Sequence, residues 1–267
     1  MSETGFGATR KIAVVTGASS GIGEVYARRL AGLGYDLLLT ARRTELMEKL
    51  AAELREQNEI ETRVVSVDLA DAGQLDQLSK EIESLGSIGF LVHAAGFGYM
   101  GDFVDLPMEK HQRMLDVHMT ATVRLCYATL PGMIESNVGS IVNVSSVAAW
   151  TVGPGQAMYN SSKAFVKTFS ESLHMELEGT NVHVQALCPG VTYTGFHDTP
   201  EFAGFDRSEM PGSWMTPQDV VDESLAALKK NRAVCVPGSN NRFLTLLFKS
   251  DRVRRIAGKK VRKQAPK

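Results

Sequence analysis

A tyrosine and a lysine stand four positions apart in the stretch "YNSSK", residues 159–163. On a helix this spacing places Tyr159 and Lys163 one turn apart on the same face. A neighbouring ammonium favours the phenolate and so lowers the pKa of a tyrosine, which is otherwise about 10. Such a tyrosine could exchange a proton near neutral pH, and the pair therefore indicates acid–base chemistry. A chance pair on an ordinary helix is the alternative, and the rest of the chain must decide between the two.

The composition bounds the kind of protein that carries this pair. The chain has 267 residues, of which 43% are hydrophobic and 22% charged, as in a globular protein with one large core. No apolar run approaches the roughly 20 residues that span a bilayer. Residues 1–10 lack a long apolar stretch and predict a disordered N-terminal tail, not a signal peptide. We therefore expect a cytoplasmic protein.

Neither the cysteines nor the histidines have the spacing of a metal site. Cys126, Cys188 and Cys235 stand far apart, which favours reduced thiols in a core over a disulfide or zinc framework. The six histidines are scattered, without the short spacings of metal ligands. The sequence predicts no metal.

The net charge of -1 hides an asymmetry between the two ends of the chain. Residues 242–267 contain ten Lys and Arg against Asp251 alone, a net +9 that leaves -10 for the remainder. Apolar residues alternate with these cations, so 241–267 predicts a basic amphipathic extension that could contact an anionic membrane surface. A solvated helix packed on its own domain or on another subunit explains the pattern equally well. No recognised nucleic-acid-binding motif accompanies the charge, so we predict no nucleic-acid partner.

Short apolar runs alternate with longer helical patterns along the whole chain, as in a parallel sheet with crossover helices. The predicted strands are 11–16, 36–41, 62–67, 89–94, 139–144, 182–187 and 232–237. The predicted helices are 22–33, 44–57, 71–85, 107–134, 157–178 and 217–230. Residues 11–240 therefore predict a single-domain α/β fold of the Rossmann type, with a doubly wound parallel seven-stranded sheet.

The stretch 193–216 has no regular pattern and is long for a connection inside a compact domain. It follows the sixth predicted strand, and ligands of doubly wound sheets bind beyond the carboxyl ends of the strands. We therefore predict a substrate loop that closes over a fairly apolar pocket. Its candidate lining residues, each equally explained as core, are Phe97, Tyr99, Trp150, Met158, Phe196 and Trp214.

A glycine-rich stretch, "TGASSGIG", directly follows the first predicted strand and precedes a helix. Gly17, Gly21 and Gly23 allow a tight turn and close approach of a ligand to the backbone, and the helix N-terminus favours a pyrophosphate. The second strand is followed by Arg42 and Arg43, with no acidic residue for a ribose 2′-hydroxyl. Guanidinium groups suit a 2′-phosphate, so we predict NADP(H) in preference to NAD(H). Two solvated surface arginines are the alternative.

Together, these motifs resemble the classical short-chain dehydrogenase/reductase family over residues 11 to about 240. The resemblance is carried by "TGASSGIG" at 16–23, Asp68 in "VDL", "AAG" at 94–96, "NVSS" at 143–146, Tyr159-x-x-x-Lys163 and "PGVTYT" at 189–194. The form of the first motif resembles this branch and not the extended branch of epimerases and dehydratases. The nearest resemblance is to bacterial members related to ketosteroid and ketoacyl reductases.

The resemblance implies a role for each matching residue. Tyr159 would be the general acid in reduction and the base in oxidation, Lys163 would lower its pKa and hold the nicotinamide ribose, and Ser146 would bind the substrate oxygen. Ser145 is the neighbour without a catalytic role. The residues implied to bind the cofactor are Gly17, Ser19, Ser20, Gly21, Ile22, Gly23, Arg42, Arg43, Asp68, Leu69, Ala95, Gly96, Tyr159, Lys163, Pro189, Gly190, Val191 and Thr194.

Two positions depart from the family pattern. The usual Asn-Asn-Ala-Gly is His93-Ala94-Ala95-Gly96 here, and His118 in "LDVHMTA" stands where the family has a catalytic asparagine that helps fix a water near the lysine. A histidine can also hold a water and titrates near pH 6.5, so the relay could persist with an altered pH dependence. A packing role for His118 is the alternative.

The sequence therefore predicts an NADP(H)-dependent oxidoreductase that reduces a lipophilic ketone or aldehyde, or oxidises a secondary alcohol. An NADP-binding sensor or scaffold that has lost turnover is the alternative, and an isomerase built on the same site would differ only in its substrate. The family commonly pairs its fourth and fifth helices between subunits, so the resemblance also implies a homo-oligomer.

Overall fold

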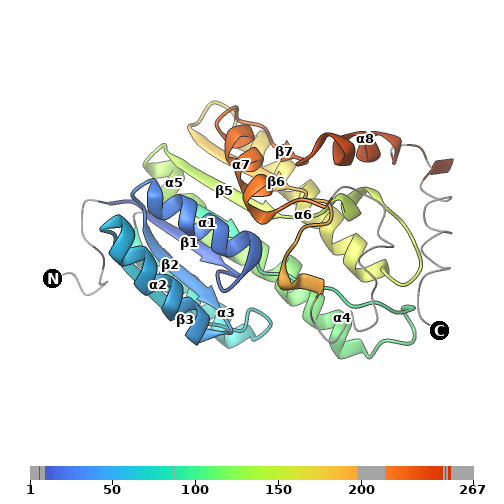
Figure 1. Ribbon diagram of the computed structural model, residues 1–267, viewed down its shortest axis with the longest axis horizontal. Helices are drawn as coiled ribbons and strands as arrows, with labels where there is room; N and C mark the ends of the chain where they lie inside the picture. The colour runs from blue at the N-terminus through green and yellow to red at the C-terminus, as the bar shows by residue number, and fades with distance from the viewer. Residues whose placement is uncertain are drawn as a thin grey trace.

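The computed structural model describes residues 6, 10–86, 88–197, 214–248, 250 and 252–253. Within them, seven strands form one sheet in the order β3-β2-β1-β4-β5-β6-β7, and every pairing is parallel (Figure 1). The strand order reverses direction between β1 and β4, which is the hallmark of a doubly wound sheet. The strands are β1 (Ile12–Thr16), β2 (Asp36–Ala41), β3 (Thr62–Ser66), β4 (Ile88–His93), β5 (Gly139–Val144), β6 (Val182–Leu187) and β7 (Val234–Cys235). The predicted fold is confirmed.

Helices connect the strands and cover both faces of the sheet. They are α1 (Gly21–Gly32), α2 (Thr44–Asn58), α3 (Ala72–Leu85), α4 (Met108–Leu115), the π-helical η1 (Asp116–Thr120), α5 (Ala121–Glu135), the 3-10 turns η2 (Val147–Trp150) and η3 (Gly195–His197), α6 (Ala157–Glu176), α7 (Pro217–Leu228) and α8 (Ser239–Leu247). Two of the α-helices begin with a side-chain cap. Asp71 accepts the backbone N–H groups of residues 73 and 74 at α3, and Thr216 accepts that of Asp219 at α7.

Two hydrophobic cores lie on opposite faces of the sheet, because successive strand residues point to opposite sides. Ala13 and Val15 of β1 pack with α1, α2 and α7 on one face. Ile12 and Val14 pack with α3, α5 and α6 on the other. This sandwich, visible in Figure 1, fixes the carboxyl ends of the strands, where the predicted chemistry lies.

The structure corrects two predicted elements. The single helix expected over 107–134 is divided by η1, a π-helical turn that contains His118. The last strand is only Val234–Cys235, and α8 follows it as a separate short helix. Parts of three predicted segments lie outside the described residues: most of the tail 1–10, residues 198–213 of the substrate loop, and residues 249, 251 and 254–267 of the extension. None of the described helices combines the length and the apolar composition needed to cross a membrane.

Candidate active site

The glycine-rich turn between β1 and α1 is built for close backbone approach. Gly17 and Gly21 have φ values of 66° and 62°, which residues other than glycine rarely adopt. A Cβ on Gly17 would lie 2.8 Å from the Ala95 backbone N, and one on Gly21 would lie 2.9 Å from Thr194 Cγ2. The turn thus brings together segments from the ends of β1, β4 and β6.

The N-terminus of α1 leaves its first backbone N–H groups available to an anion. Ser20 is the N-cap residue, but its side chain makes no capping hydrogen bond. Gly23 lies so close to the Gly17 carbonyl that a Cβ there would be 2.4 Å from its oxygen, so no side chain can fill this cradle. A helix terminus of this kind fits the pyrophosphate of a dinucleotide.

The Arg43 guanidinium and two serine hydroxyls meet beside this turn. The Arg43 guanidinium donates to Ser19 Oγ at 2.9 Å and to Ser20 Oγ at 2.6 Å. Arg42 is exposed and close enough to Asp68 to lower the pKa of that carboxyl. Exposed guanidinium groups next to hydroxyls at the end of β2 suit a phosphate ester better than a neutral ribose hydroxyl.

The predicted adenine-side residue Asp68 is held by a partner that the sequence did not suggest. Its Oδ2 accepts from Arg113 on α4 at 2.6 Å, and its Oδ1 accepts the Ala70 N–H at 3.1 Å. Burial opposes ionisation of this carboxyl, but these hydrogen bonds outweigh it and lower its pKa. Arg113 therefore fixes Asp68 as a carboxylate, beside Leu69.

Tyr159 and Lys163 both face the end of β5, next to Ser146. Lys163 is 4% exposed, and its Nζ donates to the Val144 carbonyl at 3.1 Å and lies 5.8 Å from the centre of the Tyr159 ring. Burial lowers the pKa of Lys163 to about 8. The Ser146 side chain is close enough to the Tyr159 phenol to lower its pKa.

The expected lowering of the Tyr159 pKa by Lys163 is wrong for this structure. Burial raises the pKa of Tyr159 to about 12, and the hydrogen bond from Ser146 only partly opposes the increase. The Lys163 ammonium, which lies 5.8 Å from the centre of the ring, does not offset the effect of burial. Tyr159 is therefore a protonated phenol at neutral pH, the form that can donate a proton.

The two neighbouring serines have different partners. The Ser145 hydroxyl donates to the Lys163 carbonyl at 2.7 Å, which attaches α6 to the end of β5. The Ser146 Oγ accepts the Ala148 N–H at 3.1 Å as the cap of η2, so its proton is directed to another acceptor. Ser146, and not Ser145, thus presents an O–H donor beside Tyr159.

His118 fills the space between the β4–α4 loop and α6. Its Nε2 accepts the Phe97 N–H at 3.2 Å, so its Nδ1 carries the proton and donates to Ser162 Oγ at 2.9 Å. Ser162 in turn donates to the Tyr159 carbonyl at 2.8 Å. Burial and the nearby Lys163 charge lower the pKa of His118 well below its usual 6.5. His118 is therefore neutral near pH 6.5 in this structure, and its role in the site stays a prediction.

We expect His118→Asn to leave the shape of the pH profile of kcat/KM unchanged between about pH 5.5 and 7.5, because neutral His118 contributes no ionisation there. The profile is to be measured with NADPH and a ketone that the wild type reduces. A break near pH 6.5 that the variant loses would show that His118 titrates during turnover.

His93 joins the first turn to η1. Its Nε2 donates to the Val117 carbonyl at 3.1 Å, and its Nδ1 accepts from Thr16 Oγ1 at 2.9 Å. Thr16 Oγ1 also accepts the Ala95 N–H at 3.1 Å. His93 is 2% exposed, and burial lowers its pKa to about 4. Neutral His93 therefore connects the end of β1 at Thr16 to η1 at Val117.

Acid should destabilise the fold through His93. Its folded-state pKa lies below the unfolded value of about 6.5, so its contribution is present above pH 6.5 and is lost as the pH falls toward 4. The loss should reach about 3 kcal/mol between pH 7 and 4. Urea unfolding at both pH values measures it. Between pH 7 and 4, the free energy of unfolding of the His93→Asn variant should fall by about 3 kcal/mol less than that of the wild type. Equal losses in the two proteins would show that His93 does not have a lowered pKa.

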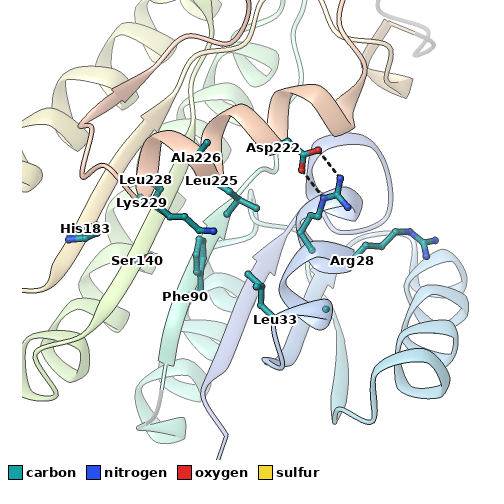
Figure 2. A pocket seen from close by; sticks show the side chains of 12 residues that line it. Arg28, Leu33, Phe90, Ser140, His183, Asp222, Leu225, Ala226, Leu228 and Lys229 are labelled. Atoms are coloured by element: carbon teal, nitrogen blue, oxygen red, sulfur yellow. Dashed lines mark hydrogen bonds and ion pairs between the residues drawn. The ribbon is translucent and has the colours of Figure 1, made fainter.

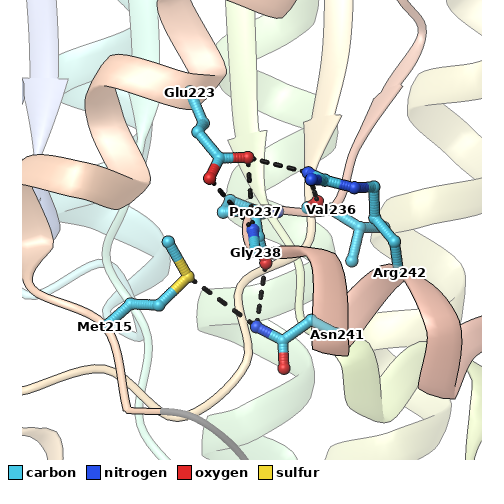
Figure 3. Close-up of polar contacts among 7 residues, drawn as sticks. All are labelled: Met215, Glu223, Val236, Pro237, Gly238, Asn241 and Arg242. Carbon is cyan, nitrogen blue, oxygen red and sulfur yellow. Dashed lines mark hydrogen bonds and ion pairs between the residues drawn. The ribbon is translucent and has the colours of Figure 1, made fainter.

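The loop after β6 is supported by Asn241 of α8, whose amide also contacts Pro237 and Met215 (Figure 3). Pro189, Gly190 and Val191 follow β6, and the Val147 N–H donates to the Pro189 carbonyl at 2.9 Å. Asn241 of α8 packs on Gly190 so closely that a Cβ there would lie 2.5 Å from the amide. Asn241 also donates to the Pro237 carbonyl at 2.8 Å. No local sequence signal connects Asn241 with a loop 50 positions earlier.

Aromatic side chains surround the phenol of Tyr159. The ring centre of Phe196 lies 6.1 Å from that of Tyr159, and Phe97 lies 5.5 Å from His118 and 5.3 Å from Tyr99. The other predicted lining residues take different positions. Met158 lines a very small cavity beside Tyr159, Trp150 lies under the Lys167 ammonium, and Trp214 stacks near Tyr193.

A cavity of about 730 Å³ lies elsewhere, between α1 and α7 (Figure 2). Its floor includes Ser140 and His183, near the amino ends of β5 and β6, and its rim contains the Arg29–Asp222 ion pair. It is thus at the opposite end of the sheet from Tyr159.

Among the described residues, no three His, Cys, Asp or Glu side chains gather as a metal site would require. The three cysteines are free thiols, and all of them are buried.

The fold and this arrangement define a dinucleotide-binding oxidoreductase. Residues 11–201 match the family model described as short chain dehydrogenase. The chain belongs to the short-chain dehydrogenase/reductase family.

Relatives extend over most of the chain. It is 29% identical over 229 residues to a 7β-hydroxysteroid dehydrogenase of Mediterraneibacter gnavus, and the match covers 86% of each protein. It resembles the short-chain dehydrogenase of Sphingobium yanoikuyae solved with NADPH at 32% identity and a TM-score of 0.81, covering 88% of this chain and 91% of the other. It also resembles the bulky-bulky ketone specific alcohol dehydrogenase of Comamonas testosteroni at 31% identity and a TM-score of 0.76, covering 92% of each.

Proposed function

We propose that this protein is an NADP(H)-dependent carbonyl reductase, acting on a lipophilic ketone or aldehyde and, in reverse, on a secondary alcohol. The observation that carries the proposal is the placement of buried Lys163, which is hydrogen-bonded to the end of β5 and lies 5.8 Å from the centre of the Tyr159 ring, beside Ser146 at the start of η2. Family membership alone does not decide between the two dinucleotides. The preference for NADP(H) rests on Arg42 and on the Arg43 contacts with Ser19 and Ser20.

A bound nicotinamide dinucleotide supplies or accepts the hydride. The chain's own residues handle the proton: Tyr159 donates it to the substrate oxygen in reduction and removes it in oxidation. The Ser146 O–H donates to the same oxygen and stabilises the negative charge that develops there. Lys163, charged below about pH 8, favours this charge electrostatically and holds the nicotinamide ribose. The protonated phenol is the form that reduction requires.

The substrate class follows from the surroundings of Tyr159. Phe97, Tyr99 and Phe196 offer an aromatic wall that suits a lipophilic molecule. The 7β-hydroxysteroid and bulky-ketone relatives, by their names, act on molecules of that kind. We further propose a cytoplasmic location, as the sequence predicts, and a homo-oligomer, as the family resemblance implies.

The alternative of a sensor without turnover was motivated by His93 and His118. Both are neutral and hydrogen-bonded within the framework, and neither interrupts the contact of Tyr159 with Ser146. No observation favours the alternative over the reductase.

Fluorescence titration with NADPH and NADH, followed by reduction of a panel of bulky ketones and 1,2-diketones, tests the proposal. We expect tighter binding of NADPH than of NADH and turnover of at least one bulky ketone. Tight NADPH binding without turnover over about pH 5 to 9 would favour the sensor.

A further inference from the structure

One buried histidine beside the site, His111 of α4, has no part in the chemistry proposed above. It is 3% exposed, and its ring stacks on that of Phe103 with the ring centres 4.6 Å apart. Its Nε2 lies 2.9 Å from the Phe103 carbonyl oxygen. Because a carbonyl can only accept a hydrogen bond, Nε2 carries the proton of the neutral ring and Nδ1 presents a lone pair.

The Nδ1 atom of His111 is a buried acceptor without a donor. No side chain or backbone N–H in the part of the chain that the structure describes bonds to it. Folded proteins pair nearly all of their buried polar atoms, because an unpaired one has lost its hydrogen bonds to water. A bound molecule with an O–H or N–H group would supply the missing bond.

His111 lines a small cavity that reaches the catalytic tyrosine. The cavity has a volume of about 10 Å³, and Tyr99, Met158 and Tyr159 also line it. This volume is close to the smallest that admits a single water-sized group. A trapped water needs about two to four polar partners, whereas a hydroxyl group of a larger molecule needs one acceptor for its proton. The unpaired Nδ1 therefore suits such a hydroxyl group.

The position of the cavity relates this acceptor to the reacting carbonyl. Tyr159 lines the cavity and, in the proposed function, also protonates the substrate oxygen. Tyr99, on the same cavity, packs edge-on against Phe97 of the aromatic wall, with the ring centres 5.3 Å apart. A lipophilic molecule with its carbonyl at the phenol can thus extend along this wall to His111.

We propose that His111 is a specificity-determining residue whose Nδ1 accepts a hydrogen bond from a hydroxyl group of the substrate, remote from the reacting carbonyl. The inference rests on the proposed reductase activity and narrows the substrate class to hydroxylated lipophilic ketones. A substrate that lacks the hydroxyl group would leave Nδ1 unpaired, and sites of this kind discriminate against such analogues. An ether oxygen cannot replace the hydroxyl group, because it has no proton to donate.

Matched ketones test the proposal on the wild-type protein. The probes are 2-decalone, a set of hydroxy-2-decalones that differ in the position of the hydroxyl group, and the methyl ethers of these alcohols, each reduced with NADPH. We expect at least one hydroxy-2-decalone to have a kcat/KM about tenfold above that of 2-decalone. Its methyl ether should fall back to the value of 2-decalone or below it.

Two substitutions separate the acceptor from the contact of the ring with Phe103. The amide nitrogen of His111→Gln lies three bonds from Cβ, as Nε2 does, so it can still donate to the Phe103 carbonyl, but no acceptor replaces Nδ1. The amide oxygen of His111→Asn lies two bonds from Cβ, as Nδ1 does, and replaces the acceptor. The roughly tenfold preference for the hydroxylated ketone should disappear in His111→Gln and persist in His111→Asn. A purely structural role would not change this ratio.

The matched control is His174→Gln, which changes a histidine near the end of α6 whose Nδ1 donates to the Val184 carbonyl. It should keep the wild-type preference. The proposal is overturned if no hydroxy-2-decalone is preferred over 2-decalone, or if His111→Gln keeps the preference. Reduction of the ketones without such a preference would leave the reductase standing and remove only the role of His111. Tight NADPH binding with no ketone reduced would remove both.

Discussion

Replacing Tyr159 with phenylalanine is expected to lower kcat/KM for ketone reduction by at least about a thousandfold. The phenol is the one group in hydrogen-bonding contact with Ser146 that can supply a proton to the substrate oxygen in our proposal. Its ring remains in the variant, so the aromatic packing against Phe196 is preserved. The dissociation constant of NADPH should therefore change by less than about threefold, and kcat should carry the loss.

Tyr127→Phe is the matched control, because Tyr127 is 75% exposed on α5 and lies outside the site. It should retain full activity. A Tyr159→Phe enzyme that kept a rate within about tenfold of the wild type would remove the phenol from the mechanism.

Replacing Arg42 and Arg43 together with alanine should weaken NADPH binding by about 10²-fold or more and NADH binding by less than about threefold. Arg43 bridges Ser19 and Ser20, and Arg42 lies near Asp68, so both cations adjoin the position where α1 begins. A 2′-phosphate would lose charge-assisted hydrogen bonds in the variant, whereas a 2′-hydroxyl has little to lose. Competitive titration of the two dinucleotides measures the ratio directly.

Arg55→Ala provides a control of the same chemistry, because Arg55 is on α2 and contacts only Thr62 among its hydrogen-bond partners. It should bind both dinucleotides like the wild type. Equal losses for NADPH and NADH in the double variant would contradict the 2′-phosphate argument.

Local sequence signals were sufficient for the sheet and for the turn after β1. The predicted helix over 217–230 is present as α7, and its cap, Thr216, acts within one turn of the chain. The tight turn expected at Gly17 and Gly21 is also present, and both residues have positive φ. Such features depend on neighbouring residues alone, so a single sequence contains them.

Contacts between distant segments were not predictable in the same way. Nothing near Asn241 indicates that it packs on Gly190, and nothing near Arg113 indicates its ion pair with Asp68. The pKa of Tyr159 was predicted in the wrong direction for a related reason. The spacing to Lys163 is local, but the burial that raises the pKa comes from the folded surroundings.

Transfer of deuterium from NADPH labelled at C4 to a bulky ketone tests the proposed reaction most directly. We predict that one of the two C4-labelled diastereomers delivers one deuterium to the carbinol carbon of the product alcohol, as detected by mass spectrometry. Tight NADPH binding with no deuterium in any product of the ketone panel would contradict the reductase and leave a nucleotide-binding protein without turnover.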